Sequence, residues 1–354
     1  MRDILYIYNN TKIYLIMKKT ALITGISGQD GAYLAKFLLK KNYKVIGADR
    51  RSARDNKWRL QYLGIENKVR IEYIDLTEIN SLIRLFKKYN FNEVYNLAAQ
   101  SFVKSSFDNP IITSLSTAIG PLNILEIIRN LKLKPKFYQA SSSEMFGDVE
   151  AKSQNENSKL NPQSPYAISK VFAHYTTINY RKSYNLFAVN GILFNHESPL
   201  RGEEFVTRKI TIGLAKIISK KLKYLEVGNL YAKRDWGFAG DYVEGMWKMM
   251  QNKRPEDFVL ATGKTYTIKH FIDTATNILK LRTKWIGKGL NERLINLDNN
   301  KIIVKINKKF FRPTEVDYLK GDYSKAKKAI KWGPKTDFKE LVKIMLQSDI
   351  KIYG

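Results

Sequence analysis

A short strand, a glycine-rich turn and a helix follow one another near residue 20, and this combination restricts the possible folds more than any other feature. The apolar run Thr20–Thr24 leads into GISGQDG, where Gly25, Gly28 and Gly31 recur at every third position before a helical pattern at 32–40. Such glycines allow a tight turn and a close approach of the backbone to a pyrophosphate at the helix N-terminus. Glycines are also common in ordinary loops, so it is their place after the first strand that predicts a dinucleotide site.

Apolar runs and helical patterns then alternate as far as residue 194. Strands are predicted at 44–48, 69–74, 93–97, 136–142 and 187–194, and helices at 79–88, 112–130 and after residue 164. This alternation predicts an α/β fold with a doubly wound, parallel Rossmann-type sheet and right-handed crossovers. We expect residues 1–16 to be a floppy extension or a mis-assigned start and 17–194 to form the dinucleotide-binding domain. Residues 195–354 are expected to form mainly a smaller α/β substrate-binding cap, with some segments returning to the first domain.

The stretch between 136 and 170 carries the residues best suited to acid–base chemistry. Tyr166 and Lys170 are four residues apart on a predicted helix, so the ammonium can approach the phenol and lower its pKa from about 10. Ser142 and Glu144 follow the preceding strand and supply a hydroxyl and a second acid–base group. The same spacing also occurs, without a strand ending in Ser-Ser-Ser-Glu before it, at Tyr8/Lys12, Tyr14/Lys18 and Tyr323/Lys327. The context of Tyr166 therefore distinguishes it from packed rings beside solvated lysines.

The end of the second strand bears on the choice of cofactor, and its signals conflict. Asp49 lies 18 residues after Gly31 and could hold the ribose hydroxyls of NAD, while Arg50 and Arg51 could bind the 2′-phosphate of NADP. An arginine pair at this turn is harder to explain otherwise, although it could be a solvated loop pair. The sequence therefore favours NADP over NAD.

Composition narrows the remaining classes. A net charge of +28 would suit a polyanion partner, but the lysines are scattered among Asn and Ile, so an anionic small substrate is expected rather than nucleic acid. The absence of cysteine excludes disulfides and thiolate sites, and with only three histidines, far apart, no catalytic metal is expected. No run approaches the roughly 18–20 apolar residues of a membrane span, and residues 1–16 lack the shape of a signal peptide. A cytoplasmic protein with no membrane partner is therefore expected.

Polar clusters in the C-terminal part are expected to line a pocket for an anionic ligand. The cluster at 195–202 follows the carboxyl end of a strand, where open α/β sheets bind ligands. Further polar clusters lie at 206–209, 233–236 and 311–315. Each alone is more simply read as surface charge. Residues 284–309 are expected to form a loop plus a hairpin in the cap.

Several motifs together make the chain resemble the GDP-mannose 4,6-dehydratases of the extended short-chain dehydrogenase/reductase family, over nearly all of 17–350. These motifs are TGISGQDGAYL, YNLAAQSFV, FYQASSSEMFG, GILFNHESPLRGEEFVTRKI and AKRDWGFAGDYVE. The resemblance implies a lyase that uses NADP and loses water without net redox change. Tyr166, assisted by Lys170, would take the proton of the mannose 4-hydroxyl, and Glu144 would remove the C5 proton. Ser142 stands where the family usually has threonine, and the hydroxyl is kept.

The resemblance also assigns binding positions. Cofactor positions, together with neighbours from the glycine turn and the fourth strand's end, are Gly25, Ser27, Gly28, Gln29, Asp30, Gly31, Arg50, Asp75, Leu76, Leu97, Ala98, Ala99, Gln100, Ser101, Lys170, His196 and Arg201. Positions for the GDP-sugar are Asn195, Lys209, Arg234 and Arg312. Asp49 departs from the family's pattern, so the preference for NADP over NAD stays open. The resemblance further implies a homodimer or homotetramer.

Other functions remain open at this point. The nearest alternative is a nucleotide-sugar epimerase or a 4-keto-6-deoxy sugar reductase on the same fold. Glu144 beside Ser142 favours a dehydratase over an epimerase. A catalytically silent dinucleotide sensor is disfavoured by the intact Ser142, Tyr166 and Lys170, and a nucleic-acid binder by the scattered charge.

Overall fold

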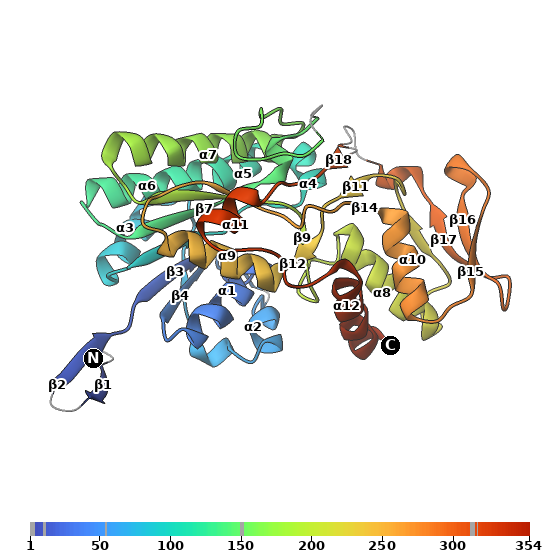
Figure 1. Ribbon diagram of the computed structural model, residues 1–354, viewed down its shortest axis with the longest axis horizontal. Coiled ribbons are helices and arrows are strands. Elements are labelled where there is room, and N and C mark those ends of the chain that lie inside the picture. The colour runs from blue at the N-terminus through green and yellow to red at the C-terminus, as the bar shows by residue number, and fades with distance from the viewer. Residues whose placement is uncertain (1–3, 10–11, 54, 149–151, 312–315, 317) are drawn as a thin grey trace.

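A seven-stranded parallel sheet forms the body of the computed structural model, which describes all residues except 1–3, 10–11, 54, 149–151, 312–315 and 317 (Figure 1). The strands lie in the order β13 (Phe258–Leu260), β8 (Ala188–Leu193), β7 (Lys136–Ser142), β6 (Glu93–Asn96), β3 (Thr20–Thr24), β4 (Lys44–Asp49) and β5 (Arg70–Tyr73). All neighbouring pairs are parallel. The predicted Rossmann-type sheet is thus confirmed, while the short strand β13 was not predicted.

Helices cover both faces of this sheet. They are α1 (Gln29–Lys40), α2 (Trp58–Tyr62), α3 (Ile79–Lys88), α4 (Val103–Asp108), α5 (Pro110–Ser114), α6 (Gly120–Asn130), α7 (Pro165–Tyr184), α9 (Ala239–Gln251) and α11 (Ser324–Ala329). Alternate residues of β3 point to opposite faces, as its pleat requires. Ala21 and Ile23 join the core formed with α1 and α9, whereas Leu22 joins the core formed with α3 and α6.

One stretch of this helical layer is a long apolar segment. Residues Pro110–Asn130 form a continuous helical segment, with η2 (Leu115–Ile119) between α5 and α6, that is long and apolar enough to cross a membrane by length and composition alone. The expectation that no such run exists is therefore wrong. Half of its most apolar window is buried in the fold, and the segment packs against α3 and α7, as a core helix of a globular protein does.

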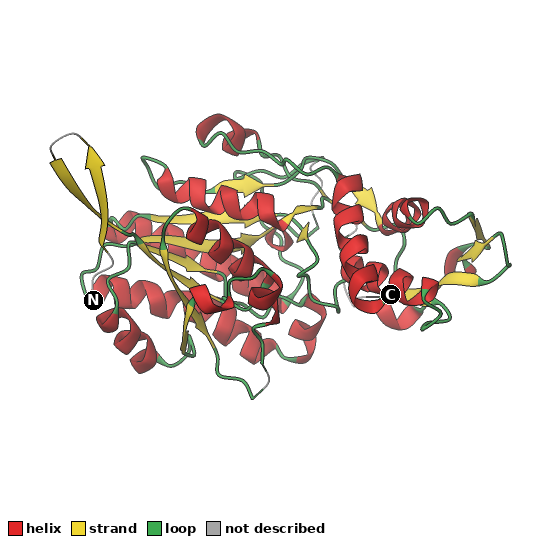
Figure 2. Cartoon of the chain, turned by 90° about the horizontal axis from the view of Figure 1, so that it is seen from below, coloured by secondary structure: helices red, strands yellow, loops and turns green. Residues whose placement is uncertain are grey.

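The cap lies at one end of the molecule (Figure 2). Its mixed sheet has the order β10 (Leu225–Val227), β17 (Ile302–Ile306), β16 (Arg293–Asn296) and β15 (Thr283–Ile286), and its helices are α8 (Val206–Ile218), α10 (Ile268–Ile278) and α12 (Phe338–Tyr353). Residues 284–309 thus contain the expected hairpin, but a third strand, β17, takes the place of the expected loop. Short strands between the two parts are β9 (His196–Glu197), β11 (Lys233–Arg234), β12 (Gly237–Phe238), β14 (Tyr266–Thr267) and β18 (Tyr318–Leu319).

Asp235 joins the cap to the body. Its buried carboxylate accepts hydrogen bonds from the backbone amides of Thr262, Gly263 and Gly321 and from the Thr262 hydroxyl, at 2.6–3.2 Å. Burial raises the pKa of Asp235, and these donors oppose that rise. A carboxylate that accepts this many bonds in the interior fixes the chain segments that it connects.

The N-terminal residues form a hairpin rather than the floppy extension expected from sequence. Strands β1 (Ile4–Asn9) and β2 (Lys12–Met17) pair antiparallel, and in both views the hairpin stands away from the body (Figures 1 and 2). Among the described strands these two pair only with each other.

Deleting residues 1–16 is expected to leave the cooperativity and midpoint of thermal unfolding unchanged, because the body's sheet begins at β3. Melting followed by circular dichroism tests this expectation. A matched control that begins at Ile23 removes the first half of the central strand and should not fold. Loss of a cooperative transition in the shorter deletion would show that the hairpin belongs to the fold.

Candidate active site

The glycine turn between β3 and α1 is shaped for a ligand at the helix start. Gly25 has φ of +70°, which glycine adopts at little cost. A Cβ on Gly31 would lie 2.3 Å from the carbonyl oxygen of Gly25, so no larger residue fits there. Gly28, the N-cap of α1, has no side chain to bond the first amides of the helix, which leaves these donors and the positive end of the helix dipole for an anion.

One cavity of about 360 Å³ runs from this turn along the carboxyl ends of the strands. All four residues predicted to be catalytic and all of those predicted to bind the cofactor line it, together with Asn195. The fold brings them together because the carboxyl ends of parallel strands meet at one edge of the sheet. What each residue binds stays a prediction. Within the described part of the chain, no group of three or more His, Asp or Glu side chains is placed to hold a metal ion.

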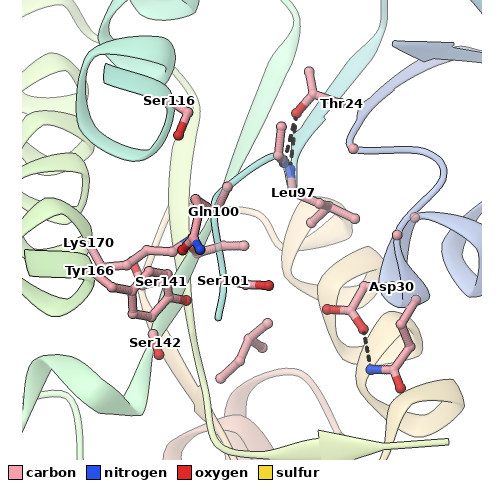
Figure 3. A pocket seen from close by; sticks show the side chains of 18 of the residues that line it. Thr24, Asp30, Leu97, Gln100, Ser101, Ser116, Ser141, Ser142, Tyr166 and Lys170 are labelled. Atoms are coloured by element: carbon pink, nitrogen blue, oxygen red, sulfur yellow. Dashed lines mark hydrogen bonds between the residues drawn. The ribbon is translucent and has the colours of Figure 1, made fainter. Parts of the chain in front are cut away.

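Thr24 connects the ends of strands β3 and β6 beside the cavity (Figure 3). Its hydroxyl accepts from the amides of Leu97 and Ala98, both at 3.2 Å, and donates to Asn96 at 2.7 Å. The end of β6 is thereby held against the glycine turn. Among the residues beyond β6, Gln100 has a buried side-chain oxygen with no hydrogen-bond partner in the described protein.

Ser142, Tyr166 and Lys170 lie on the wall formed by β7 and α7 (Figure 3). Glu144, in the turn directly after β7, lines the same cavity. The Ser164 side chain accepts the Ala167 amide at 3.1 Å and so caps α7, which places Tyr166 in the first turn, facing inward and 8% exposed. The Ser142 hydroxyl accepts the Glu144 amide at 3.2 Å and lies close enough to the Tyr166 phenol to lower its pKa. The phenol, the hydroxyl and the carboxylate are therefore neighbours, as three groups acting on one substrate must be.

The predicted lowering of the Tyr166 pKa by Lys170 is wrong for this structure. Burial raises the pKa of Tyr166 to about 12, opposed chiefly by the Ser142 hydrogen bond. Lys170 Nζ donates to the Ala140 carbonyl at 2.7 Å and lies 5.7 Å from the centre of the Tyr166 ring. Burial also lowers the pKa of Lys170 to about 8, so its charge is lost as the pH rises through about 8. Desolvation thus outweighs the pairing that the spacing suggested.

A second, open cavity adjoins the end of β4, where the sequence signals conflicted. Asp49, Arg50, Arg51 and Asp75 line it. The Asp49 carboxylate accepts the backbone amide of Arg50 at 2.9 Å, whereas both arginine side chains are exposed. Asp49 is therefore partly engaged by the turn itself, and the two guanidinium groups are accessible to a ligand.

A third cavity separates the body from the cap. Asn195, Lys209 and Arg234 line it as predicted, whereas Arg312 lies outside the described residues. Lys209 Nζ lies 3.2 Å from the centre of the Phe310 ring, and burial lowers its pKa to about 8. Asn195 and Arg201 line both this cavity and the first one, so the two cavities adjoin.

Two arginines that sequence reasoning missed hold the loop that carries Arg201. Buried Arg208 donates to the carbonyls of Pro199 and Arg201 and is paired at 2.7 Å with buried Asp349 of α12. Arg59 of α2 donates to the carbonyl of Leu200 at 2.7 Å and to that of Ser27 in the glycine turn at 3.0 Å. Arg208 stood in a cluster interpreted as pocket lining, and Arg59 had no motif around it.

The parallel sheet, the glycine turn and the wall of Ser142, Tyr166 and Lys170 define an extended short-chain dehydrogenase/reductase. The sequence profile of GDP-mannose 4,6 dehydratase matches residues 22–345. The chain therefore belongs to the GDP-mannose 4,6-dehydratase family, and with it to the hydro-lyases. Relatives include GDP-mannose 4,6 dehydratases of Drosophila melanogaster (48% identical, covering 94% of this chain and 87% of the relative) and Homo sapiens (45%, covering 95% and 92%).

Solved structures of the same fold are more distant in sequence. The dTDP-glucose 4,6-dehydratase of Bacillus anthracis in complex with NAD has a TM-score of 0.78 at 18% identity, covering 94% of this chain and 97% of that one. RMD of Pseudomonas aeruginosa complexed with NADPH has a TM-score of 0.74 at 18% identity, covering 94% and 100%. At this level of identity the likeness supports the fold.

Proposed function

We propose that this protein converts GDP-mannose to GDP-4-keto-6-deoxymannose and water, moving a hydride from C4 to C6 through bound NADP. The observation that carries the proposal is the joint placement of Ser142, Glu144 and Tyr166 on one wall of a cavity that begins at the glycine turn and adjoins a basic cavity below the cap. A nucleotide-sugar epimerase or reductase of the same fold is the alternative.

The residues present fit a dinucleotide. The glycine turn offers space and backbone amide donors for a pyrophosphate at the start of α1. The buried side-chain oxygen of Gln100 could accept a hydrogen bond from the bound cofactor. When bound, the nicotinamide supplies a hydride acceptor that later returns the hydride. Lys209 and Arg234 in the adjoining cavity, with Arg201 between the two cavities, suit the diphosphate of a GDP-sugar.

Two residues of the wall carry out the two proton transfers of the reaction: Tyr166 acts in the first and Glu144 in the second. Tyr166 takes the proton of the C4 hydroxyl, and Ser142 hydrogen-bonds the same oxygen. The raised pKa of Tyr166 means that a cation must assist this step, and Arg201 is one whose charge already acts to lower that pKa. Once C4 is a ketone, the C5 proton is acidic; Glu144 removes it and passes it to the departing C6 hydroxyl, which leaves as water. Return of the hydride to C6 is accompanied by return of one proton to C5, which balances the proton that Tyr166 took.

Mass spectrometry of the product separates the candidate activities. Incubation of the protein with GDP-mannose and catalytic NADP should give a product lighter by one water. A product of unchanged mass but altered stereochemistry would indicate an epimerase. Conversion only in the presence of stoichiometric reduced cofactor, acting on the 4-keto sugar, would indicate a reductase.

We expect NADP to bind at least about tenfold more tightly than NAD. Arg50 and Arg51 are exposed at the end of β4, where the 2′-phosphate of NADP would lie. A hydrogen bond to a charged group contributes about 1.5–3 kcal/mol, and about 1.4 kcal/mol corresponds to a factor of ten in affinity. Isothermal titration calorimetry with both cofactors measures the ratio.

Matched variants identify the residues behind this preference. Arg50→Gln with Arg51→Gln should weaken binding of NADP and leave binding of NAD nearly unchanged. Asp49→Asn tests the opposing signal and should change both affinities little, because its carboxylate is engaged by the turn. Tighter binding of NAD than of NADP by the parent protein would assign the selectivity to Asp49.

The protein is also proposed to form a homodimer through one exposed apolar surface. We call this the α5–α7 face, and it consists of Ile111, Ile112, Leu115, Ile168, Phe172 and Tyr175, which are 40–76% exposed. The two helices are adjacent, with Ser169 of α7 donating to Ser114 of α5 at 3.3 Å. A surface of this kind on two parallel helices suits self-association by two-fold symmetry.

Sedimentation equilibrium tests the dimer. The double variant Ile168→Glu with Phe172→Glu places four like charges at a two-fold interface and should yield monomers. Leu290→Glu, at a position of the cap that is equally exposed at 57%, is the control and should stay dimeric. A dimer that persists in the double variant would place the interface elsewhere.

A further inference from the structure

Each ring nitrogen of His196 lies within hydrogen-bond distance of an oxygen atom. These two contacts determine how many protons His196 and its neighbour Asp30 must carry together. Its Nδ1 lies 2.7 Å from the Phe194 carbonyl oxygen, and its Nε2 lies 2.7 Å from Oδ2 of Asp30. A carbonyl oxygen only accepts, so Nδ1 carries a proton. The second contact needs one further proton, either on Nε2 or on the carboxyl group. In both cases His196 and Asp30 together are uncharged while they hold it.

The surroundings favour the imidazolium–carboxylate form. Burial alone would raise the pKa of Asp30, but His196 and Arg201 lower it below its ordinary value. Burial also opposes protonation of His196, yet the Asp30 carboxylate raises the His196 pKa above its ordinary value. Gln29 donates to the other Asp30 oxygen at 3.1 Å, and the Tyr242 ring stacks on the imidazole at 4.7 Å. The charged and titratable groups that face the pair are Arg59 of α2, Tyr138 of β7, Tyr166 and Lys170 of α7, Tyr242 of α9, and Arg201 after β9.

The pair lies where its charge would affect binding of an anionic ligand. Asp30 lies in the first turn of α1 and, with His196, lines the cavity that the proposed function assigns to the dinucleotide. Loss of the proton would leave the lone pair of Nε2 facing a carboxylate and a net charge of −1 at the helix start. That charge would repel a pyrophosphate and cancel part of the helix dipole that attracts it.

We propose that dinucleotide binding requires the one proton shared by His196 and Asp30, so that cofactor affinity falls as the pH rises. This inference rests on the proposed function, since it assumes that a dinucleotide occupies the cavity. The sign follows from charge: the pair is neutral below the pH at which it loses its proton and anionic above it. Binding of the anionic cofactor therefore takes up a proton whenever the free pair has lost it.

The test compares NADP affinity between pH 7 and 9.5 in the parent protein and in Asp30→Asn. This range lies above the titration of a phosphate monoester at about pH 6. The parent's Kd should rise with pH, by at most about tenfold per unit for one linked proton. In Asp30→Asn the amide can donate to Nε2, so the pair is neutral without a titrating proton and the slope should be smaller. Lys170 also titrates in this range, and the Asp30 charge acts to raise the Lys170 pKa. The comparison is therefore repeated with Lys170→Met in both proteins, where a remaining difference in slope comes from the pair.

Two further measurements complete the test. Nitrogen-15 spectra of labelled histidine should show both ring nitrogens of His196 protonated or sharing a proton at pH 7, and only Nδ1 protonated in Asp30→Asn. His270→Gln, a control in the cap, should keep the parent's slope. Equal slopes for the parent and Asp30→Asn, or an unprotonated, unshared Nε2 in the parent, would overturn the inference while leaving the proposed function in place. Failure of NADP to bind at any pH would overturn both.

Discussion

Replacing Tyr166 by phenylalanine is expected to reduce turnover of GDP-mannose by about 10²- to 10⁴-fold, the usual contribution of a general acid–base group. The phenol lies close enough to Ser142, Glu144 and Arg201 for each of them to shift its pKa, as expected of a group that acts together with them. Phenylalanine keeps the packed ring and removes only the oxygen. The first step, oxidation at C4, should fail.

Stopped-flow absorbance distinguishes this failure from a loss of binding. With enzyme-bound NADP and GDP-mannose, Tyr166→Phe should show no absorbance of reduced nicotinamide, while its Kd for NADP stays within a few-fold of the parent's. Tyr184→Phe is the matched control, because Tyr184 lies at the far end of the same helix with 42% of its surface exposed. Rapid formation of reduced cofactor in Tyr166→Phe would assign the first proton transfer to another residue.

The sheet and the cavity could be predicted because their signals are local. Residues 20–24 and 79–88 were bounded correctly, since an apolar run beside a glycine turn and a clear helical period need no distant information. Once the strands are known to be parallel, their carboxyl ends must share an edge, which explains why every predicted catalytic and cofactor residue lines one cavity.

Features that depend on long-range contacts escaped prediction. Strand β13 has three residues and acquires its identity only by pairing with β8. Arg59 and Arg208 bond backbone carbonyls, which have no sequence signature, and the partner of Arg208, Asp349, is 141 residues away. The partner of Lys170 is likewise a carbonyl, and the burial that raises the pKa of Tyr166 is a property of the assembled fold.

Glu144→Gln is expected to separate the second half of the reaction from the first. The carboxylate follows β7, and its backbone amide is held by Ser142, so its position is determined by the same strand end that carries the catalytic hydroxyl. Glutamine has the same shape but cannot take a proton at C5. Oxidation at C4 should proceed and elimination should stall, so that reduced nicotinamide accumulates on the enzyme while overall turnover falls by about 10²- to 10⁴-fold.

Single-turnover experiments with detection of both absorbance and product mass measure the two steps together. Glu340→Gln, an exposed carboxylate in the first turn of α12, is the control and should leave both steps unchanged. Glu144→Asp retains the acid but withdraws it by one methylene, so partial recovery of water loss is expected if the carboxylate acts chemically. If Glu144 serves only as a hydrogen-bond acceptor in its loop, glutamine should support water loss within a few-fold of the parent. That outcome would remove Glu144 from the mechanism and, with it, the main chemical reason to favour a dehydratase over an epimerase at this site.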